Sequence, residues 1–330
     1  MRRGRTIELV AILAAATLAA PAAGAPGDDI YLRPGQLVQA DGARLNLYCT
    51  GSGSPTVVFD AGHQDWAPAW AVVQPQVAKW TRACSFDRPG YGFSPPGPMP
   101  RTSERIATEL HDALRALGIT GPFVLVGHAF GATNMRTFAD LYPAELQGLV
   151  LIDPDVTDVA TPDQVARAHG FYIQQALEIQ RCGDSLAANR PQPPELACDK
   201  RFFRGFPEPG WSEALNAALA NAVHTRPGLS DAANAELTQI PDDELWLKEH
   251  AVPLGPKPMR VITWAQHKPA TIAAQATLLS LSSNARQILA THTRGAYMQF
   301  DEPRLVLDAI AVVGGRRAFP PLSSRTERGR

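Results

Sequence analysis

The sequence lacks both a strong net charge and an apolar run long enough to cross a membrane. Its 330 residues carry a formal net charge of −1, and 45% of them are hydrophobic. A chain without an excess of basic residues lacks the electrostatic surface that attracts nucleic acid. We therefore expect a globular protein with a large core and no nucleic-acid partner.

The longest apolar stretch near the N-terminus runs only from Leu9 to Ala20, whereas a membrane-spanning helix needs about 20 apolar residues. A basic segment, Met1–Arg5, precedes this stretch, and small residues follow it at 23–25. This order is typical of a secretory signal peptide. We therefore expect residues 1–25 to be a signal peptide. The mature protein is then expected to be secreted or periplasmic, without a stable membrane anchor after cleavage.

Cysteine is scarce, and its pattern argues against metal or redox chemistry. The four residues are Cys49, Cys84, Cys182 and Cys198. No C-x-x-C occurs, and none of the four lies beside a histidine at zinc-ligand spacing. An exported chain meets an oxidising compartment in which four thiols can pair completely, in three possible connectivities. We expect structural disulfides, and neither a cofactor nor a metal.

Short apolar segments alternate with amphipathic helical segments over most of the chain. The helical segment 102–117 places Ile106, Leu110 and Leu114 on one face. Such alternation is typical of an α/β protein with a mostly parallel central sheet and helices on both faces. The expected strands are 45–48, 56–59, 83–86, 123–126, 149–152, 260–263 and 287–290.

The alternation stops between residues 156 and 255, in a helical segment rich in alanine and proline. We predict that 156–255 is a cap inserted between two parts of one core, 26–155 and 256–315. The last residues, 316–330, have little apolar content and are predicted to be a disordered tail. No internal repeat is visible.

Five motifs then occur in a specific order, and together they resemble the α/β-hydrolase superfamily. The resemblance covers residues 36–155 and 256–313 and is closest to secreted or periplasmic, esterase-like members with a cap. It implies an α/β-hydrolase fold with a helical cap insertion. Within the second motif we interpret Asp87 and Arg88 as a structural ion pair. The motifs are "VVFDAGHQDW" (57–66), "SFDRPGYGFS" (85–94), "VGHAFG" (126–131), "GLVLIDPD" (148–155) and "TRGAYMQFDEP" (293–303).

The third motif has the frame of the G-x-S-x-G nucleophile elbow without its serine. The resemblance places the nucleophile at Ala129, between Gly127 and Gly131. A methyl group has no lone pair, so neither acyl-enzyme nor alkyl-enzyme chemistry can start there. The elbow position is therefore vestigial.

The resemblance places the general base directly after Gly295, where this sequence has Ala296. The base position is therefore vestigial too. His292 lies four positions upstream. It is either a displaced base or an ordinary loop histidine.

The acid of the family usually follows the strand 260–263, but residues 261–286 contain neither aspartate nor glutamate. Some relatives place the acid at the end of the preceding strand, and Asp153 is the candidate there. Its alternative role is structural, as a cap or turn residue. The oxyanion-hole amides are backbone groups, which the resemblance assigns to His63 and Phe130.

The resemblance also implies which cysteines form disulfides with each other. In this superfamily the second and fourth strands are neighbours, which implies a Cys49–Cys84 bridge. Cys182 and Cys198 then close a proline-rich loop inside the cap.

Three hypotheses follow from these residues. The chain is either an inactive scaffold of serine-esterase ancestry, with natural or engineered alanines, or an enzyme that uses other groups such as His292 or a metal-bound water. The third hypothesis is a binding protein whose partner is a small hydrophobic ester or acid. In the first case, the parent form with serine and histidine at positions 129 and 296 is an active carboxylic-ester hydrolase.

Overall fold

The computed structural model describes residues 28–156, 161–188, 190, 211–225, 228–295 and 297–316. The predicted signal peptide, the predicted tail after Arg316, Cys198 and Ala296 therefore lie outside the described residues.

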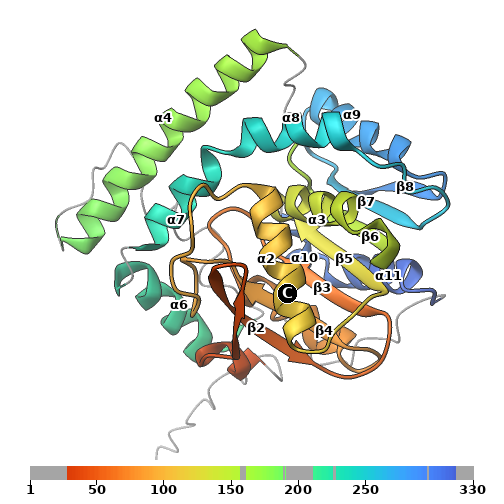
Figure 1. The fold of residues 1–330 in the computed structure, drawn as a ribbon, viewed down its shortest axis with the longest axis horizontal. Coiled ribbons are helices and arrows are strands. Elements are labelled where there is room, and N and C mark those ends of the chain that lie inside the picture. Colours follow the sequence, from red (N-terminus) through yellow and green to blue (C-terminus); the bar gives the residue numbers. More distant parts are fainter. Residues whose placement is uncertain are drawn as a thin grey trace, which may run out of the picture.

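One eight-stranded sheet organises the molecule (Figure 1). Its order is β1-β2-β4-β3-β5-β6-β7-β8, with β1–β2 and β2–β4 antiparallel and the remaining pairs parallel. Every strand expected from the sequence is present. Only β1 was missed, because half-exposed and polar positions interrupt its apolar pattern. The strands are β1 (Gln36–Ala40), β2 (Ala43–Thr50), β3 (Thr56–Asp60), β4 (Ala83–Asp87), β5 (Phe123–His128), β6 (Leu146–Ile152), β7 (Met259–Trp264) and β8 (Ala285–Ala290).

Helices cover both faces of the sheet, as the sequence predicts. Alternate residues of a strand point to opposite faces, so Leu125 of β5 joins one core cluster while Val124 and Val126 join the other. The first cluster packs against α2 and α3, and the second against α1 and α11. These helices are α1 (Gln74–Val77), α2 (Ser103–Ala116), α3 (Phe130–Leu141) and α11 (Pro303–Val313).

The start of α2 follows directly from its sequence. The Thr102 hydroxyl accepts a hydrogen bond from the Arg105 amide, which satisfies one of the free donors of the first turn. Ile106, Leu110 and Leu114 are all buried, as their helical spacing predicts. The amphipathic interpretation of this segment is therefore confirmed.

The chain between β6 and β7 is helical, and we call its four described helices the inserted helices. Figure 1 shows them along one side of the sheet, with α4 extending away from the rest. No helix among the described residues is both long and apolar enough to cross a membrane. The inserted helices are α4 (Pro162–Ala187), α6 (Glu213–Thr225), α7 (Gly228–Leu237) and α8 (Ile240–His250).

The predicted Cys49–Cys84 disulfide is present. The two residues lie directly opposite each other in the antiparallel pair of β2 and β4, which brings their side chains together. Cys182 is also disulfide-bonded. Its predicted partner, Cys198, lies outside the described residues, so that pairing stays a prediction.

Candidate functional site

The turn between β5 and α3 has the strained geometry of an elbow. Ala129 has φ 48° and ψ −118°, a backbone conformation that non-glycine residues rarely adopt. A Cβ atom at Gly127 would collide with the Gly131 carbonyl oxygen, and one at Gly131 would collide with the Asp60 carbonyl oxygen. Only glycine fits at these two positions. The turn therefore holds the Ala129 side chain between strand and helix, where a nucleophile would stand.

The loop after β3 lies against this elbow. A Cβ atom at Gly62 would be 3.0 Å from Nδ1 of His128 and 3.4 Å from Cβ of Ala129. The next residue, His63, donates from Nε2 to the Ala233 carbonyl of α7 at 2.8 Å. The two backbone amides predicted for an oxyanion hole thus belong to this loop and to the first residue of α3, Phe130.

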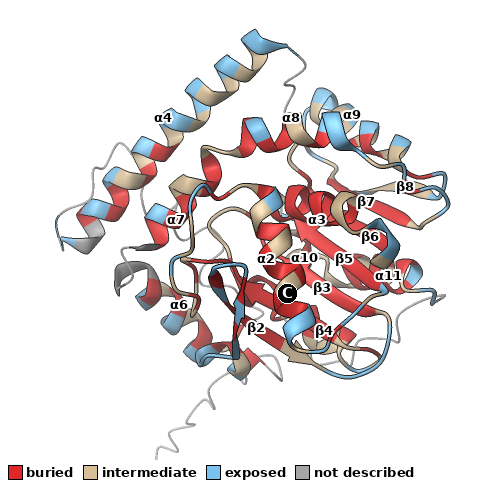
Figure 2. Ribbon diagram, in the orientation of Figure 1, coloured by how far each residue is buried: buried red, intermediate tan, exposed pale blue. Residues whose placement is uncertain are grey.

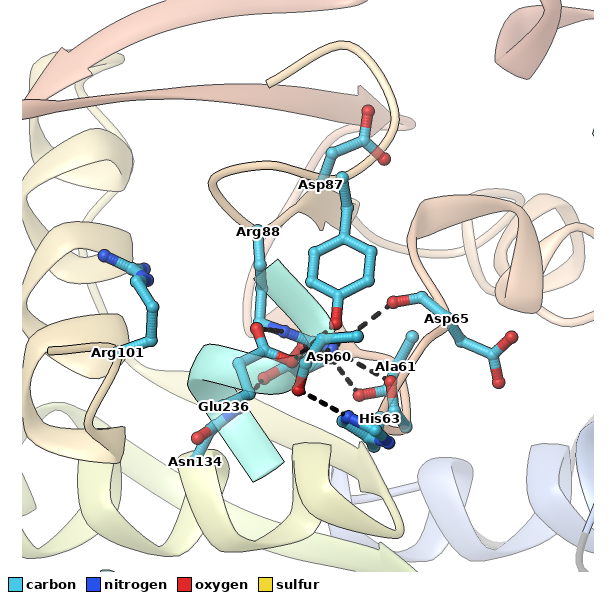
Figure 3. A network of polar contacts seen from close by, with 12 residues as sticks. Asp60, Ala61, His63, Asp65, Asp87, Arg88, Arg101, Asn134 and Glu236 are labelled. Carbon is cyan, nitrogen blue, oxygen red and sulfur yellow. Dashed lines mark hydrogen bonds and ion pairs between the residues drawn. The ribbon is translucent and has the colours of Figure 1, made fainter. Parts of the chain in front are cut away.

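A buried arginine fixes the same loop (Figure 3). Nη1 of Arg88 donates to Oδ1 of Asp60 at 2.6 Å and to the Ala61 carbonyl at 2.8 Å, while Nη2 donates to the Gly62 carbonyl at 2.9 Å. On its other side, Nε of Arg88 donates to Oε1 of Glu236 in α7 at 2.7 Å. Arg88 therefore joins the loop beside the elbow to an inserted helix.

The Arg88 guanidinium lies between two buried carboxylates, which hold its pKa well above the ordinary value even though burial opposes its charge. The Tyr91 hydroxyl also donates to Glu236, at 2.9 Å. Burial raises the pKa of Asp60, and Arg88 and Asn134 offset part of that rise. A charge trio of this kind is favourable only while all three members stay paired.

The expected Asp87–Arg88 ion pair is wrong. Asp87 instead accepts hydrogen bonds from the Asn46 side chain at 2.8 Å and from the Phe93 amide at 2.9 Å. Arg88 pairs with Asp60 and Glu236. Adjacent residues of an extended segment point to opposite sides, which is why the sequence neighbours take different partners.

Asp153, the candidate acid, stands at the end of β6 with φ 43° and is buried. Oδ1 and Oδ2 of Asp153 lie 2.7 Å and 2.9 Å from Nε2 of His267. Oδ1 also accepts a hydrogen bond from Nε2 of Gln275 at 2.9 Å. Both partners follow β7, in the stretch that contains no acid. Sequence reasoning missed His267 and Gln275. For His267, the sequence signal that could have been used is a histidine three residues after the end of β7.

His292 does not take the position of a base. Its side chain is 78% exposed, its Nδ1 lies 3.0 Å from the Thr291 hydroxyl, and its amide donates to Glu302 at 2.7 Å. It is a surface loop histidine, so the displaced-base interpretation is corrected.

Ala296 lies outside the described residues, and its neighbour in sequence contacts the site. The Tyr297 hydroxyl donates to Oδ2 of Asp65 at 3.0 Å, and its ring centroid is 5.0 Å from that of His128. The loop expected to carry the base thus approaches the elbow on the Tyr297 side.

A second set of buried polar groups joins α8 to α3. The Thr133 hydroxyl donates to Oε1 of Glu244 at 3.1 Å, and Arg136 lies 3.5 Å from Oε2. Oδ1 of Asp243 accepts the Ser103 amide at 2.9 Å, and burial raises the pKa of Asp243 to about 7. These contacts form a second polar connection between the inserted helices and the core.

That connection continues to the elbow loop. The Ser103 hydroxyl donates to the Asn134 side chain at 2.7 Å, and Asn134 donates to Oδ2 of Asp60 at 2.8 Å. Asp60 is the partner of Arg88. A continuous series of hydrogen-bonded residues therefore connects Asp243 of α8 to Glu236 of α7 by way of Asp60 and Arg88. Among the described residues, no group of three or more histidine, cysteine or acidic side chains is arranged to hold a metal ion.

Comparison with known proteins agrees with this fold. A family model described as alpha/beta hydrolase fold matches residues 55–182. The protein YbdG of Bacillus subtilis is 29% identical over 47% of this chain and 50% of its own length. The 2-hydroxy-6-oxo-2,4-heptadienoate hydrolase of Pseudomonas putida is 27% identical over 55% of this chain and 66% of its own length. The chain thus spans about half the length of YbdG, and likewise 49% of YqjL, a second B. subtilis protein.

Solved structures show the same architecture. An esterase from Thermogutta terrifontis with malate bound has a TM-score of 0.61 at 20% identity, over 82% of this chain and 94% of its own. An epoxide hydrolase from Bacillus megaterium in complex with an inhibitor has a TM-score of 0.64 at 17% identity, over 85% of this chain and 100% of its own. Residues 55–182 thus match the family model, and the solved structures share the α/β-hydrolase fold with this chain.

Proposed function

We propose that this chain is an α/β-hydrolase-fold protein of serine-esterase ancestry that does not catalyse acyl transfer with its present side chains. The observation that carries the proposal is Ala129, which occupies the strained elbow conformation with φ 48° and has no nucleophilic atom. A strained residue at such a turn normally serves to expose a nucleophile. Here the geometry remains and the reactive group does not.

The surrounding groups support an esterase ancestry. The two elbow glycines permit the tight turn. The amide of Phe130 and an amide of the loop after β3 are the kind of groups that stabilise an oxyanion in this fold. Several structural relatives are named as hydrolases, including the Thermogutta esterase. A hydrolase that has lost its nucleophile and base keeps only the rate acceleration that binding and the oxyanion hole provide.

A direct test restores the missing groups. The chain as written, the Ala129→Ser variant and the Ala129→Ser/Ala296→His variant are assayed on short and medium acyl nitrophenyl esters. Ala270→Ser serves as the matched control, because Ala270 is an exposed alanine on α9 (Pro269–Ala276). We expect hydrolysis only in the double variant, together with labelling of residue 129 by a fluorophosphonate.

Esterase activity of the unmodified chain that survives chelators would overturn the proposal. A double variant that folds, reacts with the fluorophosphonate and yet does not turn over would show that the ancestry is right and that the acid or base geometry is not restored.

We also propose that the site binds a small hydrophobic ester or acid. The support is chemical: backbone amides beside an apolar elbow suit a carbonyl or carboxylate group. A ligand that prefers the folded state raises its stability, so thermal shift with butyrate and hexanoate esters and acids is the measurement. No shift at millimolar ligand in the chain, with a clear shift in the Ala129→Ser variant, would contradict a binding role for the present sequence.

We propose further that the protein works outside the cytoplasm. The Cys49–Cys84 disulfide supports an oxidising compartment. Peptide mapping under non-reducing conditions tests both this bridge and the predicted Cys182–Cys198 bridge. Free thiols at all four positions in protein recovered from its native compartment would contradict the assignment.

A further inference from the structure

The outer face of α4 exposes large apolar side chains to solvent. The helix has 26 residues, and its inner face buries Ala176, Ile179 and Cys182. On the opposite face, Ile173 is 48% exposed and Leu177 is 56% exposed. Figure 2 shows exposed residues along this side of the helix, which extends away from the rest of the molecule. An amphipathic surface helix normally places polar residues there.

Four residues form a continuous seam on this outer face. Ala166, Gly170, Ile173 and Leu177 are all exposed and follow one another at spacings of four, three and four. This is the spacing by which one helix presents a narrow apolar stripe to another helix. We call these four residues the α4 seam.

Gly170 is a second feature of α4 that a contact with another helix would explain. A Cβ atom at this position would have nothing within 4 Å, so no contact within the described chain requires glycine there. Glycine in a helix interior costs about 1 kcal/mol relative to alanine. A small residue in an exposed seam allows a second helix to approach closely.

We propose that the α4 seam is a dimer interface, on which α4 of a second copy of this chain packs in antiparallel orientation about a twofold axis. In this arrangement residue numbers that face each other add up to about 343. Ala166 then meets Leu177 of the second copy, and Gly170 meets Ile173. A small residue faces a large one along the whole seam, which is the complementarity that close helix packing needs.

The charges that border the seam select the same orientation. Asp163 and Arg181 are exposed on one side of it, 18 positions apart. The antiparallel pair places Asp163 of each copy beside Arg181 of the other, so the twofold axis creates two attractive pairs. In a parallel pair about a twofold axis, Asp163 of one copy and Arg181 of the other lie near opposite ends of the helix pair, so neither attractive pair forms.

Sedimentation velocity on the full chain over a wide concentration range tests the interface. We expect a reversible monomer–dimer equilibrium, and we expect Leu177→Arg to raise the dissociation constant at least about tenfold. Met99→Arg is the matched control, because Met99 is 57% exposed and lies in a loop outside the inserted helices. It should leave the dissociation constant unchanged.

A charge exchange tests the orientation. Asp163→Arg or Arg181→Asp alone should weaken the dimer about tenfold, because each places like charges together at two symmetric positions. The double variant Asp163→Arg/Arg181→Asp should return the dissociation constant to within about threefold of the original.

Other outcomes would overturn the proposal. A chain that stays monomeric up to millimolar concentration has no such interface. A dimer that is indifferent to Leu177→Arg uses another surface, and a double charge variant weaker than both singles excludes the antiparallel pair. Binding to phosphatidylcholine–phosphatidylglycerol vesicles that Leu177→Arg abolishes, in a chain that does not dimerise, would instead assign the seam to a lipid surface.

Discussion

Nε2 of His267 lies 2.7 Å from Oδ1 of Asp153 and 2.9 Å from Oδ2, so a histidine from the loop after β7 holds the carboxylate at the end of β6. In the ancestral arrangement that we propose, this carboxylate is the group that would orient the catalytic base. In the present chain its two oxygens already have partners.

The pairing of Asp153 with His267 should be measurable as a coupling energy. Asp153→Asn, His267→Ala and the double variant form a cycle, and we expect a coupling of about 1–2 kcal/mol because the bond joins a charged and largely buried group. Urea unfolding of the four proteins gives the value. Strict additivity would show that the two side chains do not act together.

His267 should also limit a restored enzyme. In the Ala129→Ser/Ala296→His background, the new imidazole and His267 would compete for Asp153. We therefore expect His267→Ala to raise kcat of that variant several-fold, with KM little changed. Gln275→Ala is the control that removes a neutral partner of the same carboxylate. An unchanged or lower kcat in the His267→Ala variant would show that Asp153 is not the acid.

Glu236→Gln should destabilise the fold by about 3 kcal/mol, because it leaves a buried arginine with one carboxylate partner fewer. The matched control is Asp308→Asn, whose partner Arg304 and own side chain are each 41% exposed. Exposed pairs contribute little, so that variant should change the free energy of unfolding by less than about 0.5 kcal/mol. Equal effects of the two substitutions would contradict the importance of burial.

Ala129→Gly should stabilise the protein by about 1 kcal/mol. Glycine adopts a positive φ without steric cost, and the relief exceeds the entropy that it adds to the unfolded chain. Ala132→Gly, three residues later in the first turn of α3, should instead destabilise by about 1 kcal/mol, because it removes a buried methyl group from a helical position. Thermal unfolding of both variants decides the point, and a loss of stability for both would show that the elbow at position 129 is not strained.

The stability should depend on pH through Asp243. Folding raises its pKa to about 7, so the native state binds this proton more tightly than the unfolded state. The contribution is fully present below about pH 4 and is lost as the pH rises through 7. Asp243→Asn should therefore match the parent at pH 4 and be more stable above pH 7. Glu249→Gln, an exposed change on the same helix, is the control, and parallel pH profiles for all three proteins would refute the assignment.

The fold was largely predictable because it depends on local patterns. Apolar runs such as Phe123–Val126 specify buried strands, and the spacing of Ile106, Leu110 and Leu114 specifies the inner face of α2. The Cys49–Cys84 bridge followed from strand order in the family. β1 was missed because its burial comes from pairing with β2 and not from its own pattern.

The partners of the site residues were not predictable in the same way. Arg88 and Glu236 are 148 positions apart, and Asp153 and His267 are 114 apart. No local pattern connects such residues, because only the path of the inserted helices and of the loop after β7 brings them together. Asp87 beside Arg88 shows the error that follows when sequence neighbours are taken as partners.

The position of Glu236 has a consequence for protein engineering. Its carboxylate completes the charge balance of Arg88, whose other contacts fix the loop beside the elbow. The inserted helices are therefore not an interchangeable module. A chimera that receives the corresponding segment of a relative should fold with an ordered elbow loop only if the new segment brings a carboxylate to the same place.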